Sequence, residues 1–413
     1  MRILFALPYV PSLIRVRPYN LIRQLAQDHE VTVVAIGAEE EMADASALRE
    51  LRCTVVVVPF RLGEAINNCL KAAIRREPLQ AAVCRSRYLE QAFCSLLANR
   101  PFDVVHIEHL RAAHLRALVP DGFPTLFDSV DCISLLLKRT LQSSHSLRQR
   151  VVAAVELGRT KAYEARLLSS FDTVVATSPE DCSALRSLEG RARVVVVPNG
   201  VDLQYFRPLA GPREPATIVL SGKMSYHANV TAALHFARDI FPLVRKMRPE
   251  ARLRIVGSNP PRSVRDLARD PAISVIGYLP DIREAVGSAT VAVCPVIVKV
   301  GIQNKVLEAM AMGVPVVCTR QGHAGLIARP DEDLLVADNP AEFAEHVCRL
   351  LADPNLCQRL GRAGREYVEA HHRWTVAAQS LEALYREAVQ TRAKPQLSGP
   401  QPAREPGEAV SLA

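Results

Sequence analysis

Short apolar runs alternate with amphipathic stretches along the first half of the chain. The apolar runs have the length of buried strands, and the stretches between them carry apolar residues at helical spacing or turn residues. The predicted strands are Arg2–Leu7, Val31–Ile36, Thr54–Pro59, Val104–Ile107, Thr125–Phe127, Thr173–Thr177 and Arg193–Val197. The predicted helices are Tyr19–Gln27, Leu62–Arg100, Leu147–Leu168 and one that begins with Pro179 after the N-cap Ser178. Because strands separated by helices form parallel sheets, this half predicts one parallel-sheet domain.

The same alternation begins again after the turn sequence Pro198–Asp202 and a linker at Leu209–Pro215 that is rich in Pro and Gly. The predicted strands are Thr217–Ser221, Arg252–Val256, Ile273–Ile276, Ala289–Val298 and Val314–Cys318. The predicted helices are Asn229–Met247, Arg262–Ala268, Ile282–Ser288, Pro340–Leu351, Pro354–His371 and Trp374–Val389. We therefore predict an α/β fold with two parallel-sheet domains, 1–198 and 199–371, and a cleft between them. The last helix falls in 372–390, and the polar composition of 391–413 predicts a disordered tail.

Composition excludes several classes of protein. The net charge of +8 is spread evenly along the chain, and aromatic residues make up 5%, so we predict no nucleic-acid partner. The ten cysteines form no C-x-x-C pair, which is typical of reduced core residues in a cytoplasmic protein.

The sequence also bears on membranes. No apolar run reaches the roughly 18 residues that a membrane span needs, and Met1–Pro8 is too short in its apolar part for a signal peptide. Two stretches, Leu62–Arg100 and Lys138–Arg166, nevertheless carry several Lys and Arg residues. Leu62–Arg100 is either a membrane-facing element or an amphipathic helix pair packed on its own sheet, and Lys138–Arg166 either faces anionic lipid or is a solvated helix face. We expect a cytoplasmic protein that is at most peripheral at a membrane.

Polar residues gather where strands of the first half end. His106, Glu108 and His109 end one strand, and Asp128 and Asp131 end the next. Such residues line the crevice of open α/β sheets, although each is equally well explained as an N-cap or a hydrogen-bonded strand end. The two histidines lack a third ligand, so no metal site is predicted.

The first loop carries two arginines where many nucleotide-binding folds have glycines. Arg15 and Arg17 either meet an anionic acceptor near the cleft or lie on the protein surface.

The most informative stretch begins at Gly301, after the apolar run Ala289–Val298. It predicts a glycine loop followed by a helix that ends at Gly313. The unpaired amides of a first helical turn favour an anion, and Lys305 lies in that turn. Glu308 projects from the same face three residues later. A cation with free amides suits a diphosphate, and the carboxylate suits sugar hydroxyls; the alternative is a surface Lys–Glu pair on an ordinary βαβ unit.

Three features together resemble a family 4 glycosyltransferase with the GT-B fold over about residues 1–390. They are the two strand–helix arrays, the joint Pro198–Asp202 followed by Phe206-Arg-Pro208, and the block Leu307–Val317. The sequences of Pro8–Arg15 and Gly301–Glu308 resemble, more closely still, sugar transferases associated with bacterial exopolysaccharide loci of the PEP-CTERM/exosortase type.

The resemblance implies that the second domain binds a nucleotide-sugar donor, that the first binds a saccharide or polyprenyl-linked acceptor, and that 372–390 crosses back onto the first domain. It implies no cofactor, no divalent metal and retention of the anomeric configuration. The implied catalytic residues are Lys223, Lys305, Asp131 and Asp128. The implied donor-binding residues are Gly301, Ile302, Gln303, Asn304, Glu308, Gly277, Tyr278 and Leu279, and the acceptor-binding candidates are Arg15, Arg17, His106 and His109.

One position departs from the family pattern. The family has a pair of glutamates eight positions apart; Glu308 is the second, and Val300 stands at the first. That carboxylate helps to place the donor sugar, so the departure leaves the donor open. Two alternatives to a transferase therefore remain: a GT-B nucleotide-sugar epimerase, and a donor-binding scaffold with impaired catalysis.

Overall fold

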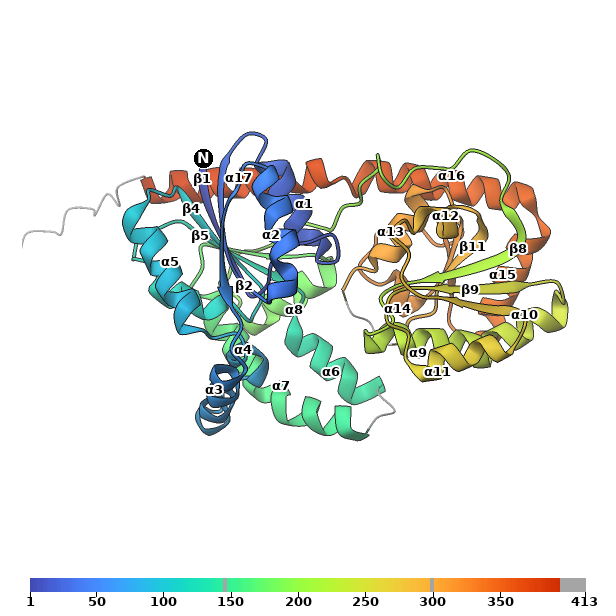
Figure 1. The fold of residues 1–413 in the computed structure, drawn as a ribbon, viewed down its shortest axis with the longest axis horizontal. Coiled ribbons are helices and arrows are strands. Elements are labelled where there is room, and N and C mark those ends of the chain that lie inside the picture. Colours follow the sequence, from blue (N-terminus) through green and yellow to red (C-terminus); the bar gives the residue numbers. More distant parts are fainter. Residues whose placement is uncertain (144–146, 298–300, 394–413) are drawn as a thin grey trace, which may run out of the picture.

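The structure is a computed structural model that describes residues 1–143, 147–297 and 301–393. Two parallel sheets form two domains that lie side by side along the long axis of the molecule (Figure 1). The helices α16 (Pro354–His371) and α17 (Trp374–Ala393) run along the top of both domains in this view. The predicted α/β class with two parallel-sheet domains is confirmed.

The first domain contains a seven-stranded sheet with the order β3-β2-β1-β4-β5-β6-β7. Its strands are β1 (Arg2–Leu7), β2 (Glu30–Gly37), β3 (Thr54–Pro59), β4 (Val104–Glu108), β5 (Thr125–Val130), β6 (Thr173–Ala176) and β7 (Val194–Val196). The order reverses beside β1, and β1 pairs with β4 so that Phe5 lies opposite His106. All seven strands were predicted, with bounds that differ by at most a few residues.

Helices cover both faces of this sheet. They are α1 (Val16–Leu25), α2 (Met42–Glu50), α3 (Leu62–Arg75), α4 (Leu79–Ala82), α5 (Arg87–Asn99), α6 (Ile133–Ser143), α7 (Leu147–Leu168) and α8 (Pro179–Leu188), with 3₁₀ turns at Glu39–Glu41 and Ala113–Leu118. The stretch Leu62–Arg100, which was predicted to be helical, forms three helices, because Arg76 ends the first in a left-handed conformation and Pro78 cannot continue it. The helices α2 and α6 were not predicted.

The second domain contains a six-stranded sheet with the order β10-β9-β8-β11-β12-β13. Its strands are β8 (Glu214–Ser221), β9 (Arg252–Val256), β10 (Ile273–Ile276), β11 (Ala289–Cys294), β12 (Val316–Thr319) and β13 (Leu335–Ala337). The strand β8 begins inside the predicted linker, where Glu214 pairs with Arg254 of the neighbouring strand. The strand β13 was not predicted; it has only three residues.

The helices of the second domain surround this sheet. They are α9 (His227–His235), α10 (Phe241–Met247), α11 (Arg262–Arg265), α12 (Arg283–Gly287), α13 (Asn304–Ala311), α14 (Arg320–His323) and α15 (Pro340–Ala352), followed by α16. A π turn at Phe236–Ile240 and a 3₁₀ turn at Asp266–Arg269 extend α9 and α11. The π turn interrupts the predicted helix Asn229–Met247 just before Pro242, which has no N–H to donate.

The chain crosses between the domains twice, at 198–201 and at 371–374. The backbone N–H of Val201 donates to the carbonyl of His372 over 2.8 Å, so the two crossings are joined. After the second crossing, α17 buries Trp374 and Tyr385 in the core of the first domain, together with Phe5 and Leu21. The helix continues past its predicted end to Ala393, and 394–413, most of the predicted tail, lies outside the described residues.

Two further observations concern the expected compartment. Within the part of the chain that the structure describes, no helix combines the length and apolar composition that a membrane crossing requires. All ten cysteines are free thiols, and eight of them are buried.

Candidate functional site

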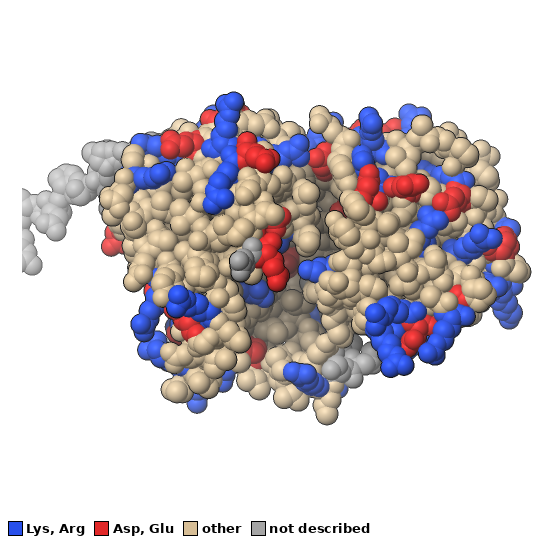
Figure 2. Space-filling view, in the orientation of Figure 1, with Lys and Arg blue, Asp and Glu red and all other residues tan. Residues whose placement is uncertain are grey.

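The two domains meet where strands of both sheets end. Asp131, which follows β5, lies against Gly301, which precedes α13, and the side chains of Asn199 and Asn304 are hydrogen-bonded nearby. Figure 2 shows a hollow between the two halves of the molecule. The carboxyl ends of parallel strands are where open α/β sheets bind ligands, so this hollow is the candidate site.

The amino end of α13 forms one wall of this site. Its N-cap, Gln303, makes no capping hydrogen bond with its side chain, and the helix has no acidic residue in its first turn. Ile302 is 8% exposed and packs in the core of the second domain, so only its backbone can meet a ligand. Backbone amides of a first helical turn that no side chain caps provide an anion-binding position.

Lys305 is held at this helix end by Asn229. The ammonium group of Lys305 donates to Oδ1 of Asn229, and Nδ2 of Asn229 donates to the backbone carbonyl of Lys223 over 3.0 Å. Asn229 therefore connects the loop after β8 to the first turn of α13. The side chain of Lys223 is exposed on that loop.

The loops after β8, β9 and β10 are in backbone contact. Gly257 has φ +156°, and a Cβ there would lie 1.8 Å from the carbonyl oxygen of Gly222, so this contact requires glycine. The N–H of Gly257 faces the carbonyls of Ile276 at 3.1 Å and Gly277 at 3.3 Å. The segment Gly277–Leu279, with Tyr278 exposed at its tip, is thereby joined through Gly257 to the loop that carries Lys223.

Glu308 lies one turn into α13, on the same face as Lys305. Its side chain is partly buried, and none of the described residues donates a hydrogen bond to its carboxylate. Loss of solvent raises the pKa of Glu308 to about 7, and the positive charge of Lys305 opposes this rise. A carboxylate in this position can accept hydroxyl groups from a ligand. Val300, where the family pattern has its first glutamate, lies outside the described residues.

A strained turn presents Asp131 to the second domain. The register of β5 against β6 shifts between Asp128 and Val130, and Val130 has φ +64°, which is costly for a β-branched residue. The turn is held by Oδ1 of Asp128, which accepts from the N–H of Val130 over 3.1 Å. A Cβ on Gly301, whose φ is +54°, would lie 2.5 Å from Oδ1 of Asp131. Asp131 is therefore the first-domain carboxylate that borders the amino end of α13.

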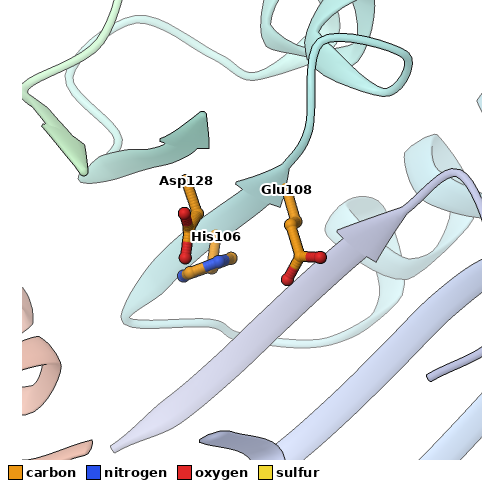
Figure 3. A group of neighbouring side chains, drawn as sticks. All are labelled: His106, Glu108 and Asp128. Carbon is orange, nitrogen blue, oxygen red and sulfur yellow. The ribbon is translucent and has the colours of Figure 1, made fainter. Parts of the chain in front are cut away.

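The other polar residues of β4 and β5 point into the interior. His106, Glu108 and Asp128 lie on neighbouring strands and project from one face of the sheet (Figure 3), and all three are fully buried. Arg17 reaches them from α1: its Nε donates to Oδ2 of Asp128 over 2.8 Å, and its Nη1 donates to the carbonyl of Val197 over 2.9 Å. Arg17, His106 and Asp128 are thus buried and hydrogen-bonded within the protein, and the acceptor and catalytic roles expected for them stay predictions.

The helix α17 closes this buried layer. The hydroxyl of Tyr385 lies 2.7 Å from Nδ1 of His106, whose ring stacks on Phe5. Burial holds the pKa of His106 well below its ordinary value, and the charge of Arg17 adds to this effect. Burial and the neighbouring Asp128 raise the pKa of Glu108 to about 8, so Glu108 is protonated at neutral pH. Among the described residues of this cluster, the ion pair is the one between Arg17 and Asp128.

His106, Glu108 and Asp128 also have the spacing of metal ligands. Within the described residues they are the one group of three whose possible ligand atoms all lie within 4.8 Å of one another. The chemistry of the surroundings disfavours a metal ion. The guanidinium of Arg17 already occupies the Asp128 carboxylate and would repel a second cation. A protonated Glu108 is also a poor ligand.

The edge of the first domain near the site is formed by Tyr9, Arg15 and His109. The guanidinium of Arg15 stacks over the ring of Tyr9 at 4.6 Å and pairs with Glu41 over 2.6 Å. The ring of His109 lies edge-on to Tyr9 at 6.2 Å. Burial and the neighbouring Arg111 lower the pKa of His109 to about 3, so its imidazole is neutral. Of the four predicted acceptor residues, the structure brings Arg15 and His109 together at this edge.

Four residues of this region were not predicted: Tyr9, Asn199, Asn229 and Tyr385. Asn199 falls in the joint Pro198–Asp202, which the sequence singled out only as a turn. Its partners Arg17 and Asn304 are 182 and 105 positions away, so no local pattern indicated them.

Two family models match the chain. A model described as "Glycosyl transferase 4-like domain" matches residues 14–200, and a model described as "Glycosyl transferases group 1" matches residues 215–353. One match falls on each parallel-sheet domain.

Individual proteins agree with these models. A D-inositol 3-phosphate glycosyltransferase of Streptomyces bingchenggensis is 23% identical over 398 residues, which span 86% of this chain and 82% of that protein. The sucrose-phosphate synthase of Thermosynechococcus elongatus has a TM-score of 0.70 at 18% identity and covers 94% of this chain and 99% of its own. HepE of Anabaena, solved with UDP and glucose, has a TM-score of 0.69 at 13% identity over 94% of this chain and 100% of its own. The two structural similarities establish the fold alone.

Proposed function

We propose that this chain, which belongs to the GT-B glycosyltransferases with a glycosyl transferase 4-like first domain and a group 1 second domain, moves a sugar from a nucleotide-sugar donor to a saccharide or polyprenyl-linked acceptor. The observation that carries this proposal is the ammonium group of Lys305, which Asn229 holds at the amino end of α13, where the N-cap residue Gln303 makes no capping hydrogen bond with its side chain. The function includes retention of the anomeric configuration and a place in exopolysaccharide biosynthesis. The sequence resemblance of Pro8–Arg15 and Gly301–Glu308 supports that place.

The donor lies along the second domain. Its diphosphate meets Lys305 and the amides of Gly301, Gln303 and Asn304, as expected for an anion at a helix amino terminus. Glu308 accepts the ribose hydroxyls one turn further along α13. The base extends toward Gly277–Leu279, whose backbone reaches the Lys223 loop through Gly257.

Catalysis follows from the charge that develops when the anomeric bond breaks. Negative charge grows on the leaving diphosphate while the sugar becomes oxocarbenium-like. Lys305 and the helix amides are fixed in place before this charge appears, and Lys223 stands on the adjoining loop. One preorganised donor of this kind lowers a barrier by about 2.7–4 kcal/mol. The mechanism therefore assigns leaving-group stabilisation to side chains and amides, without a divalent metal.

The first domain supplies the acceptor side. Asp131 is the carboxylate next to Gly301, and burial together with the charge of Asp131 raises the pKa of Tyr226 across the cleft. We assign Asp131 to the reacting centre, where its charge stabilises the oxocarbenium-like sugar. Arg15 and His109 line the neighbouring edge, where an anionic acceptor would compete with Glu41 for the guanidinium of Arg15. Arg17, Asp128 and His106 support this edge from the interior.

Incorporation of radiolabelled sugar into a lipid extract tests the proposal. UDP- and GDP-sugars that shift the melting temperature of the protein are first selected as donors. Labelled product in the lipid phase, lost in Lys305→Ala and retained in Lys246→Ala on α10, supports transfer. A free nucleotide sugar with inverted stereochemistry indicates an epimerase, and an unchanged donor in every assay indicates a binding scaffold; either result overturns the proposal.

A further inference from the structure

The helix α3 of the first domain has its large aliphatic side chains on the outside. Leu62, Ile66, Leu70 and Ile74 follow one another at every fourth position and are 67%, 54%, 63% and 83% exposed. The residues that α3 buries are Ala65 and Ala72. A surface helix normally turns its large aliphatic residues toward the core, so this stripe needs a covering partner.

The charges beside the stripe are mostly positive, and Glu64 is the one carboxylate that α3 itself contributes. Lys71 and Arg75 each follow a stripe residue by one position, which places them about 100° around the helix, and Arg76 ends it. None of these three cations forms an ion pair with any of the described residues. The nearby acidic residues are already engaged: Glu64 accepts from the N–H of Arg87 over 2.8 Å, and Glu77 pairs with Arg85 over 2.6 Å.

The stripe lies on a projecting part of the molecule. Figure 1 shows α3, α6 and α7 extending from the first domain below its sheet, and Figure 2 shows mainly basic side chains at the edge where α3 lies. The first half of α7 adds Val151, Val152 and Val155, each more than half exposed. Glu156 of α7 accepts from the N–H of Leu79 over 2.8 Å, so α7 is joined to α4, the short helix that follows α3 in the chain.

We infer that α3 docks the first domain on an anionic lipid surface, with Leu62, Ile66, Leu70 and Ile74 in the acyl boundary and Lys71, Arg75 and Arg76 among the headgroups. An aliphatic stripe flanked by unpaired cations on a protruding helix matches the amphipathic helices that lie in a membrane interface. A second copy of this chain fits less well, because a two-fold contact through the same face would bring its cations together. The docking surface is inferred from the residues of α3 alone. Its purpose, which is to bring the cleft to a lipid-linked acceptor, rests on the proposed function.

Vesicle flotation tests this docking. Wild-type protein is mixed with vesicles of phosphatidylcholine alone or with about one third phosphatidylglycerol, at low and high salt. We expect flotation with the anionic vesicles at low salt and a partition at least about tenfold weaker for Ile66→Ser/Ile74→Ser, since two exposed aliphatic side chains lose their burial. Lys71→Glu/Arg75→Glu gives a comparable loss.

Matched substitutions on the second domain serve as controls. Leu243→Ser/Met247→Ser on α10 and Arg262→Glu/Arg269→Glu also change exposed side chains, and both variants float like wild type. The inference is overturned if wild type stays unbound with anionic vesicles, or if Ile66→Ser/Ile74→Ser floats equally well. Light scattering that shows a dimer dissociated by the same serine variant also overturns it. Donor turnover with a soluble acceptor is measured in parallel. Protein that floats with the vesicles but turns over no donor would contradict the proposed function and still support the docking surface.

Discussion

The side-chain amide of Asn199 donates a hydrogen bond to Oδ1 of Asn304 over 3.2 Å, and this bond joins the segment between the domains to the first turn of α13. Asn199 also accepts from Nη1 of Arg17 over 3.0 Å, and its backbone carbonyl faces Nδ1 of His372 at 2.7 Å. One residue therefore connects the buried arginine of the first domain and the candidate donor site through its side chain, and the second crossing between the domains through its backbone carbonyl.

Replacement of Asn199 tests how much this residue contributes to the stability of the folded protein. In Asn199→Ala, the buried guanidinium of Arg17 loses one acceptor, which costs about 1–3 kcal/mol. We expect a melting temperature several degrees lower by differential scanning calorimetry. Asn304→Ala removes the contact between the two asparagines and keeps the Arg17 contact, so it should shift the melting temperature less. Equal shifts in the two variants would mean that Arg17 does not depend on Asn199.

Lys305→Ala tests the charge at the helix end. Removing one preorganised donor typically lowers kcat by about 10²–10³. Because the Lys305 side chain is only partly buried, we expect an unchanged melting temperature. Asn229→Ala keeps the ammonium group but removes its acceptor, and we expect a smaller loss of kcat, about tenfold. Steady-state kinetics of both variants decide the point: a larger loss for Asn229→Ala than for Lys305→Ala would indicate that the Lys223 loop, rather than Lys305, carries the stabilisation.

Chelation tests the assignment of leaving-group stabilisation to lysines and amides. Transfer measured after dialysis against EDTA should proceed at the rate of the untreated enzyme. The buried trio His106, Glu108 and Asp128 would not lose a functional metal, since Arg17 already neutralises Asp128. A rate that falls to background with EDTA and returns with Mg²⁺ would require a metal between protein and diphosphate.

The loop, cation and carboxylate at the amino end of α13 could be picked out from the sequence because they are close together in the chain, whereas their roles toward a donor stay predictions. The loop at Gly301, the cation Lys305 and the carboxylate Glu308 lie within eight positions, and helical spacing alone places the last two on one face. The strands could be predicted for a related reason, since strands buried on both faces are continuous apolar runs. Asn229 could not be predicted, because its contact with Lys305 spans 76 positions.

The burial of His106, Glu108 and Asp128 could not be predicted from local sequence patterns. Side chains alternate along a strand, so His106 and Glu108 share one face of β4, but the sequence does not tell which layer covers that face. The covering residue is Tyr385 of α17, 279 positions from His106. That contact, together with the ion pair between Arg17 and Asp128, turns an expected cleft surface into a buried polar layer.

The protonated state of Glu108 gives a prediction about stability. Its pKa in the folded protein, about 8, is above the ordinary value of 4.5, so folding favours the neutral form. This contribution is complete below about pH 4.5 and is lost as the pH rises through 8. In Glu108→Gln, Oε1 can still accept from the hydroxyl of Tyr9, and no charge is buried at high pH. The melting temperature of the variant relative to wild type should therefore increase between pH 6 and pH 9.

A control separates this effect from general alkaline destabilisation. Glu366→Gln changes an exposed carboxylate on α16 that pairs with Arg362, and its melting temperature relative to wild type should stay constant over the same range. A difference between Glu108→Gln and wild type that does not change with pH would mean that Glu108 is ionised throughout.

Glu308 gives a prediction about donor binding as a function of pH. Its pKa is raised to about 7 by loss of solvent, and the ionised form is the one that accepts two ribose hydroxyls. The ionised fraction rises from about 10% at pH 6 to about 90% at pH 8. The diphosphate of a nucleotide sugar does not titrate in this interval. We therefore expect the affinity for the nucleotide sugar, measured by calorimetry, to increase about five- to tenfold between these pH values.

The variant Glu308→Gln should show weaker binding that is independent of pH, because its amide does not ionise. Calorimetry in two buffers with different ionisation enthalpies adds a second readout. At pH 6, binding to wild type should release close to one proton, whereas binding to Glu308→Gln should release none. If the two proteins release the same number of protons, the group that titrates is not Glu308, and the ribose hydroxyls are bound elsewhere on the second domain.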